Sequence, residues 1–313
     1  MNKFCESQAK YTVGIHIHGN RVIIMVLKIN RFHVFVFLVG LLSVLLIFAV
    51  KAETSKKSVS GEGLSLPVVM YHHVTTNRNR AGKYVVLQEE LRRDLDYIRS
   101  MGYETVNVQD LIDYVDGKKQ LPEKVIMISF DDGFESTYTL AWPLFSERKM
   151  KAVVSPIGSV TELYTENGDR NINYAYMGWN ELSEIDKSEE FEVQNHTYDM
   201  HYNESGKRHG LAKMNSESEE EYKAALKADL SKMQTLLKEN SAIQATAAVY
   251  PYGNYSKNTL SVVKELGFRC SMVCEERINR IQPGNPESLY NLGRFNRPSG
   301  KSTESFFARL LEI

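Results

Sequence analysis

One short stretch constrains the fold of this chain more than any other. Residues 125–129 are mostly apolar, and their apolar positions follow neither a helical nor an alternating spacing. That pattern predicts a strand covered on both faces, as in a parallel sheet. The run ends in Phe130, then in the adjacent carboxylates Asp131 and Asp132, and then in Gly133. Because α/β proteins bind ligands beyond the C-terminal ends of such strands, this stretch is a candidate site.

The paired carboxylates have two interpretations. Two negative charges side by side repel, which costs free energy unless a cation or a shared proton offsets the repulsion. An aspartate directly after a strand is also a common cap for the first turn of a following helix. The stretch alone does not choose between a charged site and a capped turn, so the rest of the chain has to supply the context.

Strand-like and helix-like segments alternate from residue 65 onward. The pattern predicts strands at residues 66–72, 105–108, 125–130, 151–157, 191–195, 246–250, 270–274 and 289–292. It predicts helices at residues 87–101, 108–115, 137–150, 179–185, 216–237, 260–266 and 306–311, with a loop at 161–177. Strands that alternate with helices over about 250 residues predict a parallel α/β barrel or an open doubly wound sheet.

The chain begins with segments of a different character. Residues 34–50 carry no charge and reach the short limit, about 17 residues, for a helix that crosses a bilayer. They predict an N-terminal membrane anchor, or the apolar part of a signal peptide that is cleaved after Ala52. We expect residues 1–33 to be a cytoplasmic extension, or a mis-assigned one if translation starts at Met25. Residues 51–64, rich in Ser, Lys and Gly, predict a flexible tether to a domain at residues 65–313.

Net charge and cysteine content argue against a nucleic-acid partner, a cysteine metal site and a disulfide. The formal net charge of -1 gives no reason to expect a nucleic-acid partner. The three cysteines include no metal-binding Cys-x-x-Cys pair. Cys270 and Cys274 lie in one predicted strand at a separation of roughly 13 Å, which is too far for a disulfide. We expect the chain to act as a monomer.

Several predicted strands end in polar residues that can do chemistry. Each of these ends carries imidazole, carboxylate, phenol or guanidinium groups. The ends are His72 and His73, Asp131 and Asp132, residues 196–201, residues 250–253, and Arg294. On one shared rim of a barrel these groups would converge. Such a pattern is harder to obtain by chance than any single motif.

Three of these side chains form a candidate metal site. His196 and His201 are five positions apart, a spacing that puts them on different faces of a helix. On a strand end and the loop after it, both can turn inward. With Asp132 they form a carboxylate and two imidazoles, a set that leaves coordination positions open. We therefore predict a divalent metal ion bound by Asp132, His196 and His201, with zinc first and Co, Ni or Fe as alternatives.

Such a site predicts hydrolysis of an acyl group without a covalent intermediate. The metal would lower the pKa of a water molecule and polarise a carbonyl. Asp131 would take the proton from this water as general base. A histidine on the opposite side would protonate the leaving nitrogen, and a backbone N–H in the turn at residues 250–253 would donate to the oxyanion.

The motifs that carry these residues resemble a known family. The segments VVMYHHV, ISFDDGF, NHTYDMH and VYPYGNY resemble motifs of the polysaccharide deacetylases, the NodB-homology or carbohydrate esterase family 4 group. The resemblance covers about residues 65–298 and is closest to the poly-N-acetylglucosamine deacetylase branch. It implies a distorted (β/α)7 barrel and an extracytoplasmic, metal-dependent hydrolase. This hydrolase would remove N-acetyl groups from N-acetylglucosamine units of a surface or cell-wall polysaccharide.

The resemblance also implies roles for single residues. Asp131 would be the base and His72 the acid, since the C-terminal Leu-x-His of the family is missing and this branch takes its acid from the N-terminal Tyr-His segment. His73 is then a neighbour that contacts the substrate, or the two histidines exchange roles. The usual Arg before the third motif is also missing, and Arg294 is the predicted residue that steadies Asp131. The other candidate substrate contacts are Pro251, Tyr252, Gly253 and Trp179, of which Trp179 either stacks on a sugar or packs in the core.

Three functions remain open on these observations. The first is the N-deacetylase, held at the membrane through residues 34–50 or secreted. The second is an O-acetyl esterase on a xylan-like glycan. The third is a carbohydrate-binding homologue without activity, which would have no reason to keep both Asp131 and Asp132 together with both histidines of the site.

Overall fold

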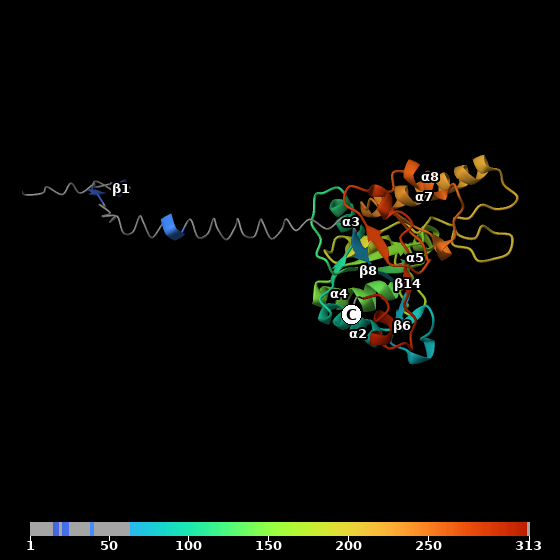
Figure 1. Ribbon diagram of the computed structural model, residues 1–313, viewed down its shortest axis with the longest axis horizontal. Helices are drawn as coiled ribbons and strands as arrows, with labels where there is room; N and C mark the ends of the chain where they lie inside the picture. The colour runs from blue at the N-terminus through green and yellow to red at the C-terminus, as the bar shows by residue number, and fades with distance from the viewer. Residues whose placement is uncertain (1–14, 19–20, 25–37, 41–62, 312–313) are drawn as a thin grey trace, which may run out of the picture. The chain divides into compact units, whose positions relative to one another are not determined.

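The computed structural model describes residues 15–18, 21–24, 38–40 and 63–311 of the chain. Contacts divide the chain into two compact units, Met1–Ser58 and Val59–Ile313. In the first unit, β1 (Ile15–His18), labelled in Figure 1, pairs antiparallel with β2 (Arg21–Ile24). All other named elements belong to the second unit.

The predicted leader at residues 34–50 lies outside the described residues, apart from residues 38–40. Within the described ranges, no helix is both long enough and apolar enough to span a bilayer. The predicted tether at residues 51–64 also lies mostly outside these ranges. Anchoring and secretion therefore stay predictions.

The second unit alternates strands and helices. Its strands are β3 (Leu64–Leu66), β4 (Val68–Tyr71), β5 (His73–Thr75), β6 (Val85–Leu87), β7 (Glu104–Val106), β8 (Val125–Asp132), β9 (Ala152–Pro156), β10 (Phe191–Val193), β11 (Ala247–Val249), β12 (Cys270–Met272), β13 (Asn279–Ile281) and β14 (Phe295–Asn296). Its α-helices are α2 (Gln88–Ser100), α3 (Val108–Val115), α4 (Trp142–Arg148), α5 (Gly158–Asn167), α6 (Trp179–Asp186), α7 (Glu219–Ser241), α8 (Thr259–Glu265) and α9 (Thr303–Phe307). Shorter helical turns are η1 (Arg78–Arg80), η2 (Thr137–Ala141), η3 (Pro251–Gly253) and η4 (Pro286–Leu289).

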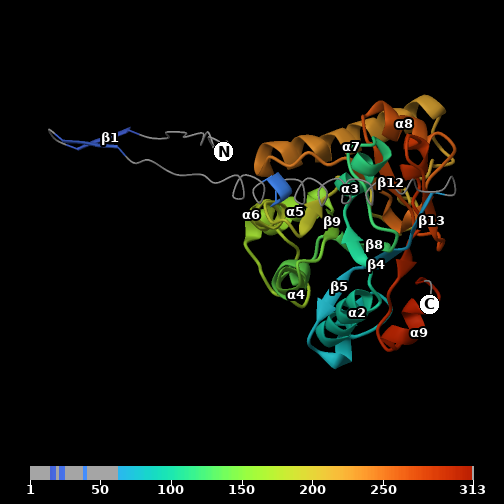
Figure 2. The ribbon, with the colours of Figure 1, turned by 60° about the vertical axis from the view of Figure 1, so that its left-hand side comes forward.

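A parallel sheet forms the centre of this unit. Its strand order is β10-β9-β8-β4-β14, and β7 pairs with the first half of β8. Every residue of β8 except the last is buried, because neighbouring strands and helices on both faces cover it. The buried parallel strand predicted at residues 125–129 is thus confirmed, and it continues to Asp132. Figure 2 shows β4 and β8 in the interior, with α2, α4, α5 and α7 around them.

The α/β class is confirmed, but the sheets do not form one continuous ladder. The strands β11 and β12 make a separate parallel pair. Single bridges, Asn195 with Ala248 and Met272 with Leu292, link this pair to the chain on either side of it. The predicted distorted (β/α)7 barrel is therefore not shown as a closed barrel, since single bridges rather than ladders join these sheets.

Four predicted elements differ from the structure. The helix predicted at 306–311 is α9, which begins at Thr303 and already ends at Phe307. The predicted loop at 161–177 is wrong over its first part, because α5 continues to Asn167. The predicted helix at 137–150 is divided into the π-helical turn η2 and α4, which has a proline in its first turn. The predicted strand at 289–292 is wrong, since η4 ends at Leu289 and the ladder with β4 begins only at β14. In each case the local pattern was short or weakly periodic, and tertiary contacts decided the outcome.

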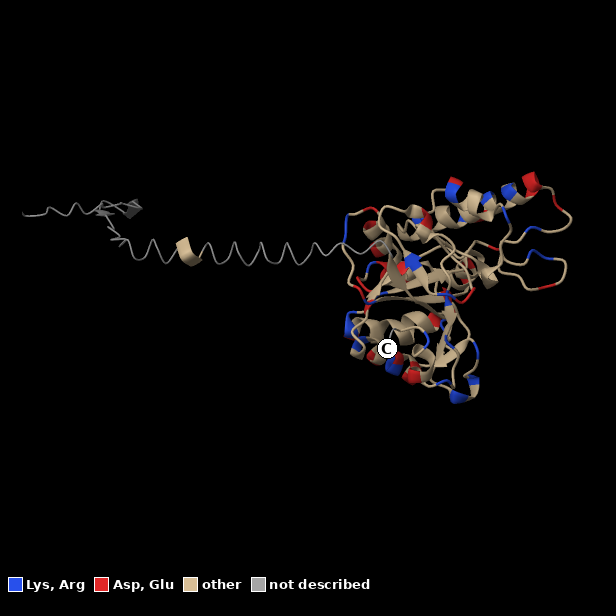
Figure 3. Ribbon diagram, viewed as in Figure 1, with Lys and Arg blue, Asp and Glu red and all other residues tan. Residues whose placement is uncertain are grey.

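The long helix α7 follows directly from its sequence. The side chain of Ser218 caps it by accepting a hydrogen bond from the N–H of Glu221, and the Glu221 carboxylate accepts one from the N–H of Ser218. Its buried side chains recur every three or four residues, at Tyr222, Leu226, Leu230, Met233 and Leu237. The opposite face of α7 is charged, and Figure 3 shows both acidic and basic residues on α7 and α8.

A buried ion pair joins α2 to the C-terminal segment. Asp94 and Arg297 are fully buried and form two hydrogen bonds, at 2.7 and 3.0 Å. The hydroxyls of Tyr71 and Thr303 also donate to the Asp94 carboxylate, at 2.8 and 2.6 Å. These donors satisfy the carboxylate, which a buried charge requires.

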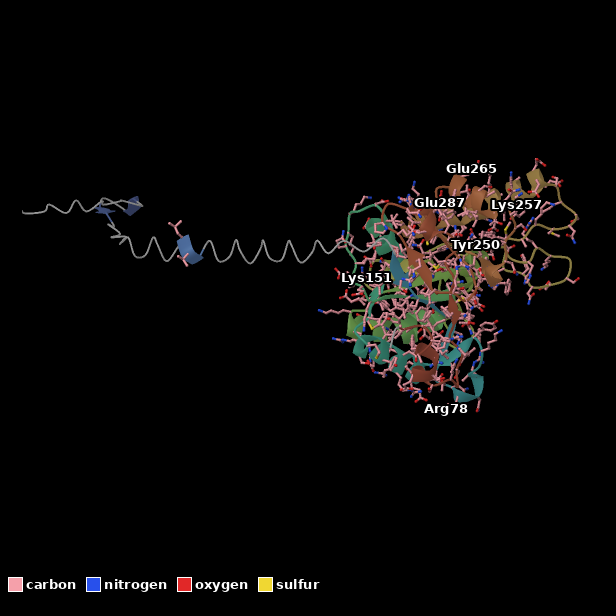
Figure 4. All side chains as sticks on the ribbon, viewed as in Figure 1. Arg78, Lys151, Tyr250, Lys257, Glu265 and Glu287 are labelled. Carbon is pink, nitrogen blue, oxygen red and sulfur yellow. The ribbon has the colours of Figure 1, made fainter. Side chains whose placement is uncertain are left out.

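We expect Asp94→Ala to lower the free energy of unfolding by about 3–5 kcal/mol, because Arg297 would be left as an unpaired buried charge. Denaturant titration measures this change. A matched control is Glu265→Ala at the exposed Lys227–Glu265 pair, with Glu265 at the outer edge of the molecule in Figure 4. That change should cost about 0–1 kcal/mol. Equal effects of the two substitutions would contradict a stabilising role for the buried pair.

Candidate active site

The turn that ends β8 directs its two carboxylates to different partners. Asp132 and Gly133 both have positive φ, at 71° and 81°. A Cβ at position 133 would lie 2.7 Å from the Cβ of Pro156, so only glycine fits here. As a result, Asp131 contacts Arg294 while Asp132 contacts two imidazoles.

The three predicted metal ligands come together. The Oδ1 atom of Asp132 lies 3.5 Å from Nε2 of His196 and 3.1 Å from Nε2 of His201. The candidate ligand atoms of the three residues all lie within 4.8 Å of one another, and this is the one such group among the described residues. Burial raises the pKa of Asp132, but the two imidazoles more than offset this, so the pKa lies well below its usual range.

The backbone fixes the ring of His196. This side chain is buried, and its Nδ1–H donates to the carbonyl oxygen of Val249 at 2.9 Å. The ring proton is therefore on Nδ1, and Nε2 directs a lone pair at Asp132. The segment that carries both histidines is held as well. The N–H groups of Tyr198 and Asp199 each donate to the carboxylate of Asp229 at 2.8 Å.

Asp229 was missed by the sequence reasoning. It lies on α7, where an aspartate among Lys and Glu residues is typical of a solvated helix face. Nothing in the local pattern indicated that it accepts two backbone hydrogen bonds from a loop thirty positions away. Burial raises the pKa of Asp229, which agrees with its position under that loop.

The arrangement of these donors fits a divalent cation. The Oδ1 atom of Asp132 is buried and has no hydrogen-bond partner. A carboxylate oxygen and two imidazole lone pairs would repel one another without a positive charge between them. One carboxylate with two imidazoles is also a donor set that suits zinc and neighbouring transition metals.

Asp131 is paired with Arg294. The guanidinium donates to both carboxylate oxygens, at 2.6 and 2.9 Å, and both side chains are buried. Arg294 also donates to the carbonyl oxygen of Val273 at 3.1 Å, which fixes the orientation of the guanidinium. Burial raises the pKa of Asp131, but Arg294 more than offsets this and holds the pKa below its usual value. Asp131 is therefore ionised at neutral pH.

The adjacent histidines His72 and His73 lie in different environments. Burial lowers the pKa of His72, and the carboxylates of Asp131 and Asp132 partly raise it again, so the ring is within electrostatic reach of both acids. Its Nδ1 atom is buried without a hydrogen-bond partner. The ring of His73 packs edge-on against Phe134, with ring centroids 4.9 Å apart. It also lies next to the backbone of residues 172 and 173. Of the two histidines, His72 is therefore the one whose pKa responds to the charges of Asp131 and Asp132.

The remaining candidate residues fall into two groups. The turn η3 lies at the site, because the Tyr252 hydroxyl is 3.1 Å from Nδ1 of His201. In this turn Pro251 is buried, and a Cβ at Gly253 would lie 2.5 Å from the backbone nitrogen of Cys274. Trp179 is instead 6% exposed and packs in the hydrophobic core, which favours its core role over sugar stacking.

A family model matches the middle of the chain. Residues 118–271 match the family described as polysaccharide deacetylase. That span contains Asp131, Asp132, both imidazoles of the site and Tyr252, whereas His72 and Arg294 lie outside it.

Several of the similar curated proteins share one name. The chain is 23% identical over 262 residues to the poly-beta-1,6-N-acetyl-D-glucosamine N-deacetylase of Escherichia coli strain K12, covering 78% of this chain and 38% of that protein. It is 26% identical over 195 residues to the protein of that name from Staphylococcus aureus strain MRSA252, covering 62% of each. The chain therefore spans less than two thirds of the length of these relatives.

Solved structures share the fold. IcaB from Ammonifex degensii superposes with a TM-score of 0.62 and 26% identity, over 75% of this chain and 93% of that one. The Streptococcus pyogenes deacetylase PplD, solved with acetate, superposes with a TM-score of 0.65 and 17% identity, over 80% of this chain and 100% of that one. The family match, the relatives and these folds agree: the chain carries a polysaccharide deacetylase domain.

Proposed function

We propose that this protein is a metal-dependent N-deacetylase that hydrolyses the N-acetyl groups of N-acetylglucosamine units in a polysaccharide. The observation that carries the proposal is the arrangement around Asp132. Its carboxylate lies 3.5 and 3.1 Å from two imidazole nitrogens, beside a second carboxylate held by Arg294. The names of the relatives from Escherichia coli and Staphylococcus aureus support this substrate class.

In this proposal Asp132, His196 and His201 hold the metal ion, which we expect to be zinc, with Co, Ni or Fe as alternatives. When bound, such an ion supplies a positive charge that lowers the pKa of a water molecule and polarises the amide carbonyl. The ion has room for these groups, because three protein ligands leave coordination positions open.

Asp131 is the proposed general base. It is ionised at neutral pH and lies next to Asp132 at the end of β8, so its carboxylate can take the proton of the attacking water. Arg294 donates to both oxygens of Asp131 at 2.6 and 2.9 Å and thereby orients the carboxylate. Arg294 is therefore the proposed cation that steadies Asp131.

The turn η3 offers the proposed oxyanion donor. The N–H of Tyr250 donates to the carbonyl oxygen of Met272, that of Gly253 donates to the carbonyl oxygen of Tyr250, and Pro251 has none. The N–H of Tyr252 is therefore the candidate that can donate to a developing oxyanion. Its backbone has the positive φ of 58°, which aims this part of the turn differently from a regular helix.

His72 is the proposed general acid, which returns the proton to the leaving nitrogen. We expect His72→Ala to lower kcat by about 10²–10⁴-fold, since that is the usual contribution of a positioned acid or base. Metal content should stay at the wild-type level, because His72 is not among the ligands. His73→Ala is the matched control, and metal analysis with steady-state kinetics measures both variants. A larger loss of kcat in His73→Ala would move the acid to that residue.

An assay of both products tests the function. Purified protein should release acetate and leave free amines on chito-oligomers, poly-N-acetylglucosamine or peptidoglycan. Acetate from acetylxylan with no amine formed on chito-oligomers would make the protein an O-acetyl esterase. Absence of both bound metal and acetate release, with sugar binding retained, would make it a carbohydrate-binding homologue without activity.

We further propose that the enzyme acts as a monomer outside the cytoplasm and has the distorted barrel of its family. The substrate class supports this location, because surface and cell-wall polysaccharides lie there. Residues 34–50 would anchor the chain, or the chain would be secreted after cleavage behind Ala52. N-terminal sequencing of the native protein distinguishes the two: a first residue at Glu53 indicates secretion, and retention of residues 34–50 indicates an anchor.

A further inference from the structure

The two imidazoles of the proposed metal site are held in different ways. His196 is buried and donates from Nδ1 to a backbone carbonyl, that of Val249, at 2.9 Å. The side chain of His201 is 22% exposed, and the group at its Nδ1 is a side chain, the hydroxyl of Tyr252, at 3.1 Å. Substitution of Tyr252 can remove the contact at Nδ1 of His201. The contact at Nδ1 of His196 is to a backbone carbonyl, which a side-chain substitution does not remove.

The ring of Tyr252 is itself fixed in place. It lies between two imidazoles, with centroids 4.5 Å from His201 and 4.9 Å from His209. The side chain of Asn254 contacts the ring nitrogen Nδ1 of His209 at 2.8 Å, which holds the outer imidazole. The side chain of Tyr252 is 39% exposed, but its ring packs between two imidazoles, and this packing directs the hydroxyl to His201.

The backbone around Tyr252 is also tightly packed. A Cβ at Gly210 would lie 2.4 Å from the carbonyl oxygen of Pro251, and one at Gly253 would lie 2.5 Å from the nitrogen of Cys274. Both glycines have positive φ, so any other residue would be strained there as well. Close contacts on both sides thus fix the turn that carries Tyr252.

We propose that Tyr252 is a positioning residue for the metal centre, whose hydroxyl accepts a hydrogen bond from Nδ1–H of His201. A histidine binds a metal through a deprotonated nitrogen, so an Nε2 that faces Asp132 requires the ring proton on Nδ1. The Tyr252 oxygen is the acceptor that the structure places at that proton. Such partners fix the tautomer and the ring orientation of metal-binding histidines. This inference rests on the proposed metal centre but not on the identity of the substrate.

The test compares Tyr252→Phe with Tyr255→Phe. The first variant removes one oxygen atom and keeps the ring that packs between His201 and His209. The control removes the same atom from an exposed tyrosine three positions on, whose ring packs on Tyr250 instead of His201. Affinity for Co²⁺ and Zn²⁺ is measured by competition with a chromophoric chelator, and the visible spectrum of the Co²⁺ protein reports ligand geometry.

We expect Tyr252→Phe to bind both ions about 10–100-fold more weakly than wild type, the range found for partners of metal-binding histidines. Its Co²⁺ spectrum should change, while Tyr255→Phe should match wild type in both measurements. Unchanged affinity and spectrum in Tyr252→Phe, or equal losses in the two variants, would overturn the inference.

A second measurement does not depend on a variant. In the Zn²⁺ protein, a ring Nδ1–H resonance of His201 should be protected from exchange with water and visible by NMR. Rapid exchange of this proton in wild type contradicts the assignment. Metal binding without acetate release from any glycan would refute the proposed deacetylase function and leave the role of Tyr252 intact. Failure of wild type to bind either ion would refute both.

Discussion

Asp131→Asn should retain the metal ion and lose about 10²–10⁴-fold in kcat, the usual loss when a general base is removed. Asparagine has nearly the shape of aspartate, but its amide cannot take a proton from water at neutral pH. The assignment is specific because Asp131 contacts Arg294, whereas Asp132 contacts both imidazoles. Metal content by elemental analysis and kcat on chito-oligomers measure the two expectations separately.

The same substitution leaves Arg294 buried without a charged partner. Because breaking a buried pair typically costs about 3–5 kcal/mol, stability must be measured alongside activity. The control is Arg294→Met, which removes the guanidinium and keeps the carboxylate of Asp131. If instability alone lowered kcat, both variants would lose activity in proportion to their unfolded fraction. A metal loss in Asp131→Asn as large as that in Asp132→Ala would contradict the role of Asp131 as base.

Asp132→Ala, His196→Ala and His201→Ala should each lose metal and activity together. Each substitution removes one of three protein ligands, so the loss of affinity should exceed the about 10–100-fold found for residues that only support a ligand. Dialysis against a chelator should give wild type the same inactive state. Adding Zn²⁺ back should restore wild type and leave the three variants inactive.

His73→Ala is the matched control for the histidine variants. The ring of His73 packs against Phe134, and His73 is not part of the group formed with Asp132. Its metal content should therefore stay at the wild-type level. Full metal content in His196→Ala or His201→Ala would show that the cluster does not bind the ion.

The central strand of the sheet could be predicted from the sequence, whereas the first and last residues of several other elements could not. Residues 125–129 are mostly apolar without alternation, a pattern that fits a strand covered on both faces, and β8 confirms this prediction. The helix α5 was missed because its apolar positions have little helical periodicity and the segment is rich in Asn, Gly and Tyr. Short segments of this kind take their structure from tertiary contacts, and sequence patterns predict them poorly.

The chemistry of the site was determined by the sequence itself. Two acids at the end of a buried strand and two histidines five positions apart are residue types and spacings that can be read directly. They predicted that Asp132, His196 and His201 form a candidate metal site, and the structure brings these three residues together. What only the tertiary structure decided is which groups hold these side chains. The hydrogen bonds of Asp229, Val249 and Tyr252 to the histidine segment join residues 30 to 53 positions apart. Such contacts depend on how strands and helices pack, and a local pattern of residues carries no record of that packing.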